Sequence, residues 1–329
     1  MKQIDHVRRD DMKLLKVLRK GFVGIVLAVV VFLGCTSAFQ LIMEHFGDKT
    51  LPVYGQRLTT GSGEMNVVVI GDTGGQKDTI VLLPGYGTPS PYFDFKALAE
   101  NLMSDFRVII SEPFGYGLSG ETQVPRTVEN MNKELHQCLE SLGIDRYILA
   151  GHSIAGIYGL HYANTYPEEV IGYLGLDTTV ACQINGADIP GWLYPALKYS
   201  GLYRIATTFS PEALWLESLN EEENSQRIRI MQHNVANASM QDEGKRFKEN
   251  LGAVQDMYFP EEIPVLFVLS DQSAEQDDYW IPEHTKLTDA VDRGETVVLE
   301  GGHYIHYNNE EKITNLVKQF FGGSDETIK

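Results

Sequence analysis

Short apolar segments alternate with helical ones along most of the chain, and this alternation is the strongest constraint on its fold. Helical periodicity is found at 95–106, 126–143, 154–167 and 310–321. Strands that are apolar throughout must be buried on both faces of a sheet, and the intervening helices supply that cover. The pattern predicts an α/β fold with a mostly parallel sheet and helices on both faces, which binds ligands at the carboxyl ends of its strands. The apolar segments are 65–71, 79–85, 107–113, 146–151, 170–177, 264–270 and 296–301.

The alternation is interrupted at residues 181–262, where the pattern is helical and rich in aromatic residues. An insertion of this size on the ligand side of the sheet indicates a helical cap over the site. Its aromatic residues either line that site or form a small core of the cap. We therefore predict an α/β core made of 64–180 and 263–322, preceded by a linker and edge strand at 44–63.

The N-terminus has a different composition from the rest. Residues 1–20 contain seven Lys or Arg and three Asp, and residues 21–43 contain no charged side chain. A helix of this second length spans the hydrocarbon core of a bilayer, about 30 Å thick. Basic flanks stay in the cytoplasm, so we predict a basic cytoplasmic segment, a single transmembrane helix at 21–43 and an extracytoplasmic catalytic domain. A cleaved signal peptide is the alternative.

The net charge of −18 at pH 7 argues against nucleic acid as a partner. The same acidic surface disfavours binding to anionic lipid headgroups, so the anchor would hold the protein at the membrane. The spacing of Cys35, Cys138 and Cys182 indicates no metal site. We expect no metal and no cofactor.

Ser153 is the candidate nucleophile. It lies in LAGHSIAG, directly after an apolar strand pattern and before a helical one. A sharp strand-to-helix turn exposes the hydroxyl and requires small neighbours. Gly151 provides one of these neighbours, whereas Ala155 stands where glycine is usual. A plain tight turn is the other interpretation of this segment.

A serine nucleophile needs a base and donors for the oxyanion. His303, in EGGHYIH, follows the last strand pattern and is the expected base. His306 is expected to have a structural or pocket role. The backbone N–H groups of Ile154, after the nucleophile, and of Tyr86, in LPGYG, are the expected oxyanion donors.

The motifs LLPGYG, SEPFGYGLSG, AGHSIAG and EGGHYIH, in this order, resemble those of the α/β-hydrolase family. The resemblance covers roughly residues 64–322. It implies an eight-stranded sheet, a catalytic triad of serine, histidine and acid, and a helical cap after the sixth strand. Pro84 stands where many members have histidine, which leaves the backbone donors unaffected.

The resemblance offers two positions for the acid of the triad. The family usually places it after the seventh strand, where SDQS has Ser273 at the aligned position. Some members place it after the sixth strand, where Asp177 ends LGLD. We favour Asp177 over Asp271, with Glu275, Asp277 and Asp278 as further candidates.

Three functions are compatible with these residues. The first is a membrane-anchored serine hydrolase that cleaves a small, partly apolar carboxylic ester, such as an acyl ester or monoglyceride, through an acyl-enzyme. The second is a peptidase or amidase of the same fold, with the acidic LNEEEN (219–224) binding an amino end. The third is a non-catalytic binding module. The resemblance disfavours haloalkane and epoxide hydrolysis, because those members need Asp at position 153.

Overall fold

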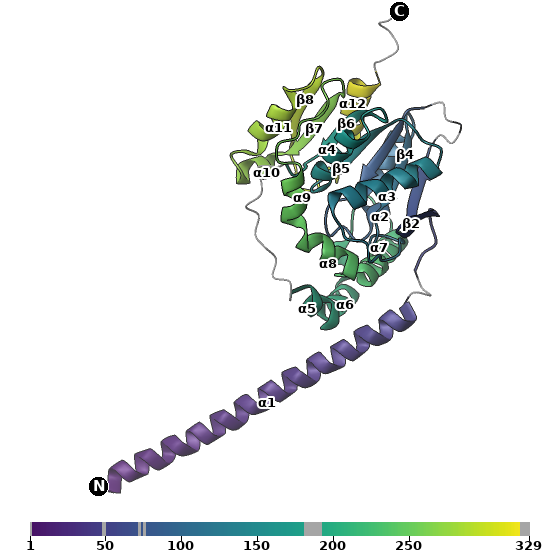
Figure 1. Ribbon diagram of the computed structural model, residues 1–329. Helices are drawn as coiled ribbons and strands as arrows, with labels where there is room; N and C mark the ends of the chain where they lie inside the picture. Colours follow the sequence, from purple (N-terminus) through teal and green to yellow (C-terminus); the bar gives the residue numbers. More distant parts are fainter. Residues whose placement is uncertain (1, 48–50, 72–73, 75–76, 181–192, 323–329) are drawn as a thin grey trace, which may run out of the picture.

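The computed structural model describes residues 2–47, 51–71, 74, 77–180 and 193–322. Its N-terminal helix α1, Lys2–Gly47, projects away from the rest of the molecule (Figure 1). Within it, Leu15–Phe46 is long and apolar enough to cross a membrane, and its side chains are almost all exposed. A membrane anchor and a signal sequence both satisfy this criterion.

The sheet of the described residues has eight strands, in the order β1-β2-β4-β3-β5-β6-β7-β8. β1 and β2 pair antiparallel, β2 also pairs antiparallel with β4, and every other neighbouring pair is parallel. This arrangement confirms the predicted fold class. The strands are β1 (Gln56–Thr60), β2 (Gly63–Ile70), β3 (Thr79–Leu83), β4 (Arg107–Glu112), β5 (Tyr147–His152), β6 (Val170–Leu176), β7 (Val265–Ser270) and β8 (Gly294–Leu299).

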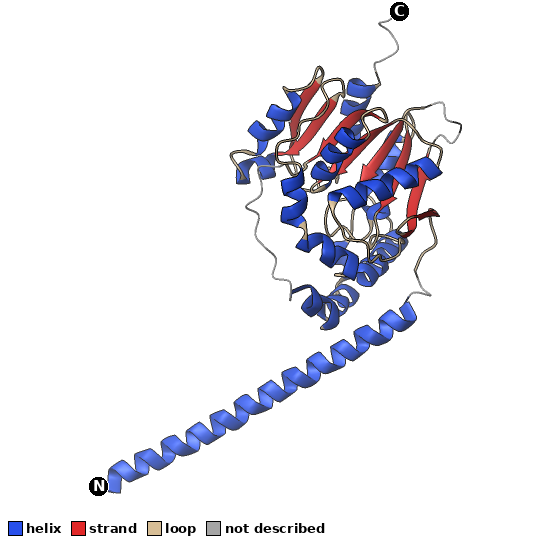
Figure 2. Ribbon diagram, viewed as in Figure 1, coloured by secondary structure: helices blue, strands red, loops and turns tan. Residues whose placement is uncertain are grey.

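Helices cover both faces of this sheet (Figure 2). Alternate residues of a strand point to opposite faces, so β3 sends Ile80 and Leu82 to one core and Val81 and Leu83 to the other. The first core includes α2 (Pro91–Leu102) and α12 (Glu310–Phe321), and the second includes α3 (Val128–Ser141) and α4 (Ala155–Thr165). Burial on two faces explains why the central strands are apolar without alternation.

A group of helices separates β6 from β7 in the chain and lies between the sheet and α1 (Figure 1). Residues 181–192, where the predicted cap begins, lie outside the described residues. Two short helices between β7 and β8, α10 (Asp271–Gln276) and α11 (Trp280–Thr288), complete the fold. The helices between β6 and β7 are α5 (Leu193–Tyr199), α6 (Leu202–Phe209), the 3-10 turn η3 (Pro211–Leu214), α7 (Glu221–Asn234), α8 (Ala238–Lys245) and α9 (Phe247–Ala253).

The acidic segment LNEEEN begins α7. Asn220 and Glu223 form a reciprocal capping box, in which each side chain accepts a hydrogen bond from the other residue's backbone N–H at 3.0 Å. Glu223 also pairs with Lys96 of α2 at 3.0 Å. These contacts give the segment a structural role at a helix N-terminus.

Candidate active site

Ser153 lies at the turn between β5 and α4, with a φ of 55°. This left-handed conformation is strained for a residue with a side chain, and such strain is typical of functional turns. Gly151 is required here, because a Cβ at this position would lie 2.8 Å from the Tyr173 hydroxyl oxygen and 2.9 Å from the Ala155 carbonyl oxygen. Ala155 itself is accommodated in the core.

His303 lies beside Ser153 and bridges it to Asp177. Its Nε2 is 2.9 Å from Ser153 Oγ, and its Nδ1 is 2.7 Å from Asp177 Oδ2. A carboxylate only accepts hydrogen bonds, so Nδ1 carries the proton and Nε2 is left to accept from the serine hydroxyl. The chain thus brings together three of the predicted site residues from separate loops.

Asp177 is fully buried, while the His303 side chain is 43% exposed. Three further donors hold the Asp177 carboxylate. Oδ1 accepts from the Ser270 backbone N–H at 2.8 Å and from Trp280 Nε1 at 3.0 Å. Oδ2 also accepts from Ser273 Oγ at 2.6 Å. Ser273, which occupies the usual acid position, therefore donates to Asp177.

Asp271 makes a different contact. Its Oδ1 accepts from the Gly301 backbone N–H at 2.9 Å. Ser270 Oγ donates to the Gly301 carbonyl oxygen at 2.5 Å. Both contacts hold the turn that precedes His303. Of the other acid candidates, Asp277 accepts from the Tyr279 backbone N–H at 2.9 Å within its own turn.

The expected oxyanion donors belong to two segments that meet next to Ser153. Ile154 is the N-cap residue of α4, so its N–H lies at a helix N-terminus. The loop that contains Tyr86 packs closely on the turn, because a Cβ on Gly85 would be 2.9 Å from Ser153 Cβ. The next residue of that loop, Gly87, donates its backbone N–H to the Tyr116 hydroxyl at 3.3 Å.

His152 is hydrogen-bonded to the backbone of the His303 loop. Its Nε2 donates to the His303 carbonyl oxygen at 2.9 Å. Burial and the neighbouring His303 lower the pKa of His152 to about 4, so the ring is neutral near pH 7 and can keep this geometry. His306 is also buried, packs its ring on His152 and Phe95, and has a strongly lowered pKa because of burial.

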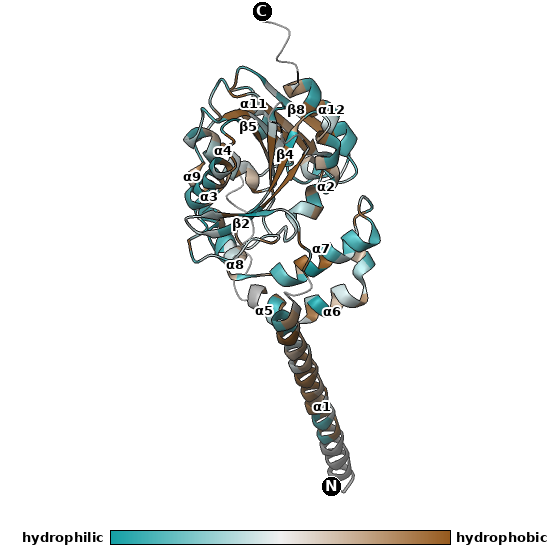
Figure 3. Ribbon diagram, turned by 90° about the vertical axis from the view of Figure 1, so that its right-hand side faces the viewer, coloured by the Kyte–Doolittle hydropathy of each residue, from teal (hydrophilic) through white to brown (hydrophobic). Residues whose placement is uncertain are grey.

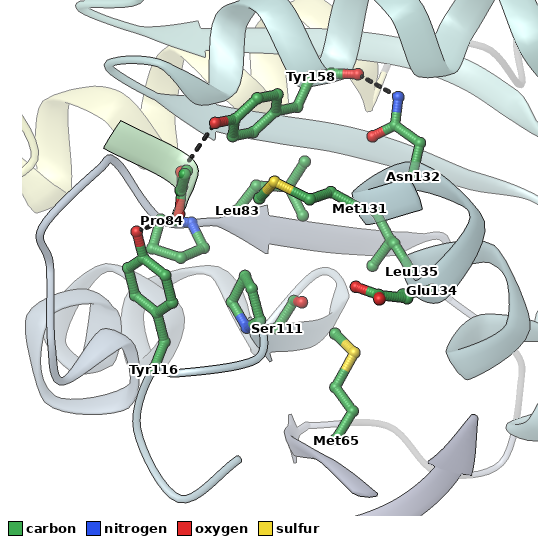
Figure 4. A pocket seen from close by; sticks show the side chains of 12 residues that line it. Met65, Leu83, Pro84, Ser111, Tyr116, Met131, Asn132, Glu134, Leu135 and Tyr158 are labelled. Atoms are coloured by element: carbon green, nitrogen blue, oxygen red, sulfur yellow. Dashed lines mark hydrogen bonds between the residues drawn. The ribbon is translucent and has the colours of Figure 1, made fainter. Parts of the chain in front are cut away.

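A buried carboxylate connects α8 to the loop that contains Tyr86 and Gly87. Glu243 accepts hydrogen bonds from Tyr116 and Tyr158, both at 2.7 Å. Burial raises the pKa of Glu243. Tyr116 in turn accepts from Gly87, so the carboxylate positions the loop through one phenol. Figure 4 shows both tyrosines among the residues that line a small cavity. This cavity has a volume of about 30 Å³, which suits a water molecule or two at most.

Comparison with known proteins identifies the family. The model of the α/β-hydrolase fold family matches residues 78–309. The chain belongs to the α/β-hydrolase family.

Individual α/β-hydrolase relatives are distant. YbdG, an uncharacterized protein of Bacillus subtilis, is 25% identical over 94% of this chain and 97% of that protein. Matches to proteins named as the carbamate hydrolase RutD are shorter, and the match to RutD of Pantoea ananatis covers 36% of its length.

Solved structures show the same fold at low identity. The epoxide hydrolase VrEH1 of Vigna radiata has a TM-score of 0.63 and 17% identity, over 81% of this chain and 97% of that one. The enol-lactonase of Burkholderia xenovorans has a TM-score of 0.58 and 17% identity, over 81% of this chain and 100% of that one.

Several site residues of this α/β-hydrolase were missed by sequence reasoning. Trp280 donates to Asp177, and Glu243 lies 90 residues after Ser153 in the chain. Ser273 was considered only as the aligned acid position, and its hydrogen bond to Asp177 was not predicted. Nothing in the local sequence around Trp280 or Glu243 distinguishes them from ordinary helix residues. A place for His152 near the site could have been predicted, since it directly precedes the candidate nucleophile.

Proposed function

We propose that this α/β-hydrolase is a membrane-anchored serine hydrolase that cleaves carboxylic esters through an acyl-enzyme. The observation that carries the proposal is the continuous contact from Ser153 Oγ to His303 Nε2 and from His303 Nδ1 to Asp177. The three groups have the order and the distances that nucleophile, base and orienting acid require.

In the proposed acylation step, His303 Nε2 takes the proton of the Ser153 hydroxyl as Oγ attacks the ester carbonyl carbon. The negative charge that develops on the carbonyl oxygen is stabilised by the N–H groups of Tyr86 and Ile154. Asp177 stabilises the imidazolium and keeps its orientation. His303 then gives the proton to the leaving alcohol, and the C–O bond breaks.

Deacylation repeats these steps with water. His303 takes a proton from a water molecule, whose oxygen attacks the acyl-enzyme carbonyl. When the second tetrahedral intermediate collapses, the Ser153 oxygen leaves and recovers its proton from His303. The acid product is released and no cofactor is consumed.

The contacts of Glu223 argue against the peptidase or amidase alternative, in which the acidic segment LNEEEN would bind an amino end. The Glu223 carboxylate accepts a hydrogen bond in the capping box and pairs with Lys96, so these contacts already occupy the group that would bind a substrate amino end. One solved structure with the same fold is named as an enol-lactonase, which supports acyl chemistry on this fold. A partly apolar acyl ester or monoglyceride suits an enzyme held at a membrane.

Two measurements test the reaction. A fluorophosphonate probe should label the wild-type protein and fail to label Ser153→Ala, and the variant should lose ester turnover by several orders of magnitude while remaining folded. Wild-type activity should be higher on a chain-length series of p-nitrophenyl esters than on aminoacyl amides. Residual turnover within tenfold of wild type in folded Ser153→Ala would reject the nucleophile.

The anchor has its own test. With residues 21–43 in the membrane and the N-terminus inside, protease added outside intact cells should remove the catalytic domain and leave a short membrane stub. A mature N-terminus close to residue 38, or activity confined to the cytoplasm, would reject it.

A further inference from the structure

Helices α5 and α6 lie against the last turns of α1 (Figures 1 and 3). Thr36 Oγ1 donates to the Ser200 carbonyl oxygen at 2.5 Å, and Arg204 Nε donates to Gln40 Oε1 at 2.6 Å. The approach is close enough to require Gly201, whose φ is 69° and whose Cβ, if present, would lie 2.2 Å from the Thr36 carbonyl oxygen.

Arg204 extends this contact into α7. Its Nη1 donates to Gln232 Oε1 at 3.0 Å, and Nη2 donates to the Gln232 carbonyl oxygen at 3.2 Å. Gln232 Nε2 donates to Thr207 at 2.8 Å. A buried guanidinium is costly unless its donors are used, so this network selects one position of α6 on α1.

α6 is amphipathic, but its apolar face is outside. Arg204 and Thr207 are buried against α1 and α7, with exposed fractions of 6% and 4%. Leu202, Ala206 and Phe209 lie within one narrow arc of the opposite face at helical spacing, and Phe209 is 81% exposed. A helix with a buried polar face and an exposed apolar face is typical of contact with lipid rather than with water.

The contacts on α1 set the depth of α6. Thr36 and Gln40 precede Met43, the end of the proposed span, by seven and three residues. At about 1.5 Å per residue, they lie roughly 10 Å and 5 Å inside the apolar segment. This depth corresponds to the boundary between headgroups and acyl chains. Leu193, Leu197 and Tyr199 of α5 add further exposed apolar side chains beside the same helix.

We propose that α5 and α6 lie in the membrane interface with Leu202 and Phe209 among the acyl chains, and that the Gln40–Arg204 contact fixes this position. The occupant of the exposed apolar face is thus the bilayer that holds α1. The inference rests on the proposed anchor and extends the proposed function by naming the source of the substrate.

The interfacial helices are connected to the site through α7. Arg227 Nε pairs with Asp94 Oδ1 at 2.7 Å, and the Tyr307 hydroxyl donates to the same oxygen at 2.9 Å. Tyr307 belongs to the loop of His303, and its ring stacks on that of Tyr304. A cap held in this way at the lipid surface favours esters that are dissolved in the leaflet over esters dissolved in water.

The test measures depth directly in the full-length protein. Cysteines are introduced one at a time into a Cys35→Ser, Cys182→Ser background, in which the remaining Cys138 is buried. Each variant is labelled with an environment-sensitive nitrobenzoxadiazole dye and reconstituted into phosphatidylcholine liposomes that contain nitroxide-labelled phospholipids. Phe209→Cys reports on α6. Ile42→Cys, exposed on α1, is the membrane control, and Glu295→Cys, exposed on β8 at the far side of the molecule, is the water control.

Dye at position 209 should be quenched by the nitroxide lipids at least half as strongly as dye at 42, and dye at 295 should be unaffected. Quenching at 42 with none at 209 would overturn the proposal and leave the anchor intact. Absence of quenching at both positions would overturn the anchor and the proposal together. Self-quenching at 209 that grows with protein density, without nitroxide quenching, would show a second copy on this face and would also overturn it.

A second arm connects depth with substrate. Leu202→Glu combined with Phe209→Glu should lower hydrolysis of a bilayer-resident monoacylglycerol about tenfold and leave p-nitrophenyl acetate hydrolysis unchanged. If the double variant and the wild type hydrolyse the bilayer-resident monoacylglycerol at equal rates, the proposal that the substrate comes from the membrane is contradicted. The dye measurement needs no catalysis, so failure of the esterase proposal and failure of the depth proposal remain distinguishable.

Discussion

Replacement of Asp177 by asparagine tests the proposed acid, because the structure dictates how the new amide must sit. The carboxylate accepts from four donors, two on each oxygen. An amide has a single acceptor oxygen. The Ser270 backbone N–H and the Trp280 indole N–H cannot turn away or become acceptors, so the amide oxygen must stay on their side.

The amide NH₂ then faces His303 Nδ1. That nitrogen must become an acceptor, and its proton moves to Nε2, which is the atom that has to accept the Ser153 proton. The tautomer is therefore wrong for catalysis. We expect kcat to fall by about 10³–10⁴, as for the equivalent amide replacement in serine proteases. This corresponds to about 4–5.5 kcal/mol in the activation free energy.

Stability should fall as well. The charge-assisted bond to His303 is lost, whereas the Ser273 hydroxyl can rotate to accept from the new NH₂ group. We expect the free energy of unfolding to decrease by about 1–3 kcal/mol, the typical cost of disturbing one buried hydrogen bond to a charged group. Urea unfolding of the wild type and the variant measures this difference.

The assay is kcat for a soluble p-nitrophenyl ester, with active sites titrated by a fluorophosphonate. Asp271→Asn is the matched control, since an amide oxygen still accepts from the Gly301 N–H, and it should cost less than tenfold. A folded Asp177→Asn variant within tenfold of wild type, or the opposite ranking of the two variants, would refute the reasoning.

Three further predictions concern groups around the site. The pKa of His152 is about 4 in the folded protein and about 6.5 in the unfolded chain, so the unfolded chain binds the proton first as the pH falls. The free energy of unfolding should therefore decrease by about 3 kcal/mol between pH 6.5 and pH 4. In urea titrations His152→Gln should remove this pH dependence, and an unchanged dependence would contradict the prediction. Tyr116→Phe removes the hydroxyl that accepts from the Gly87 N–H and should lower kcat about tenfold. Tyr158→Phe removes the other hydrogen bond to Glu243 and should lower kcat less than threefold. Equal losses would show that Tyr116 does not position the Gly87 loop. Arg126 Nη1 donates to both carboxylate oxygens of Glu134, at 2.9 and 2.7 Å, and both side chains are buried. Arg126→Met should destabilise the fold by about 3–5 kcal/mol, because it leaves Glu134 charged and buried. Adding Glu134→Met should recover most of this loss, and no recovery in unfolding experiments would argue against the ion pair as the cause.

The sequence was sufficient for the fold class because the deciding signals are local. Strands buried on two faces must be apolar at every position, as in β3 and β5, and the period of the helices between them is visible without any tertiary information. The candidate nucleophile was found for the same reason, since a sharp turn demands small residues such as Gly151 within two positions of Ser153.

The partner of His303 could not be decided in this way. The sixth and seventh strands are parallel neighbours and end at the same edge of the sheet, so Asp177 and Asp271 are both close to the histidine loop by topology alone. Only the side-chain directions separate them, with Asp177 bonded to the imidazole and Asp271 bonded to the backbone of Gly301. The contact of Gln40 with Arg204 is also invisible in the sequence, because it joins residues 164 positions apart. Hydrogen bonds of this kind depend on where packing brings two distant segments, whereas periodicity and turn residues depend only on their neighbours in the chain.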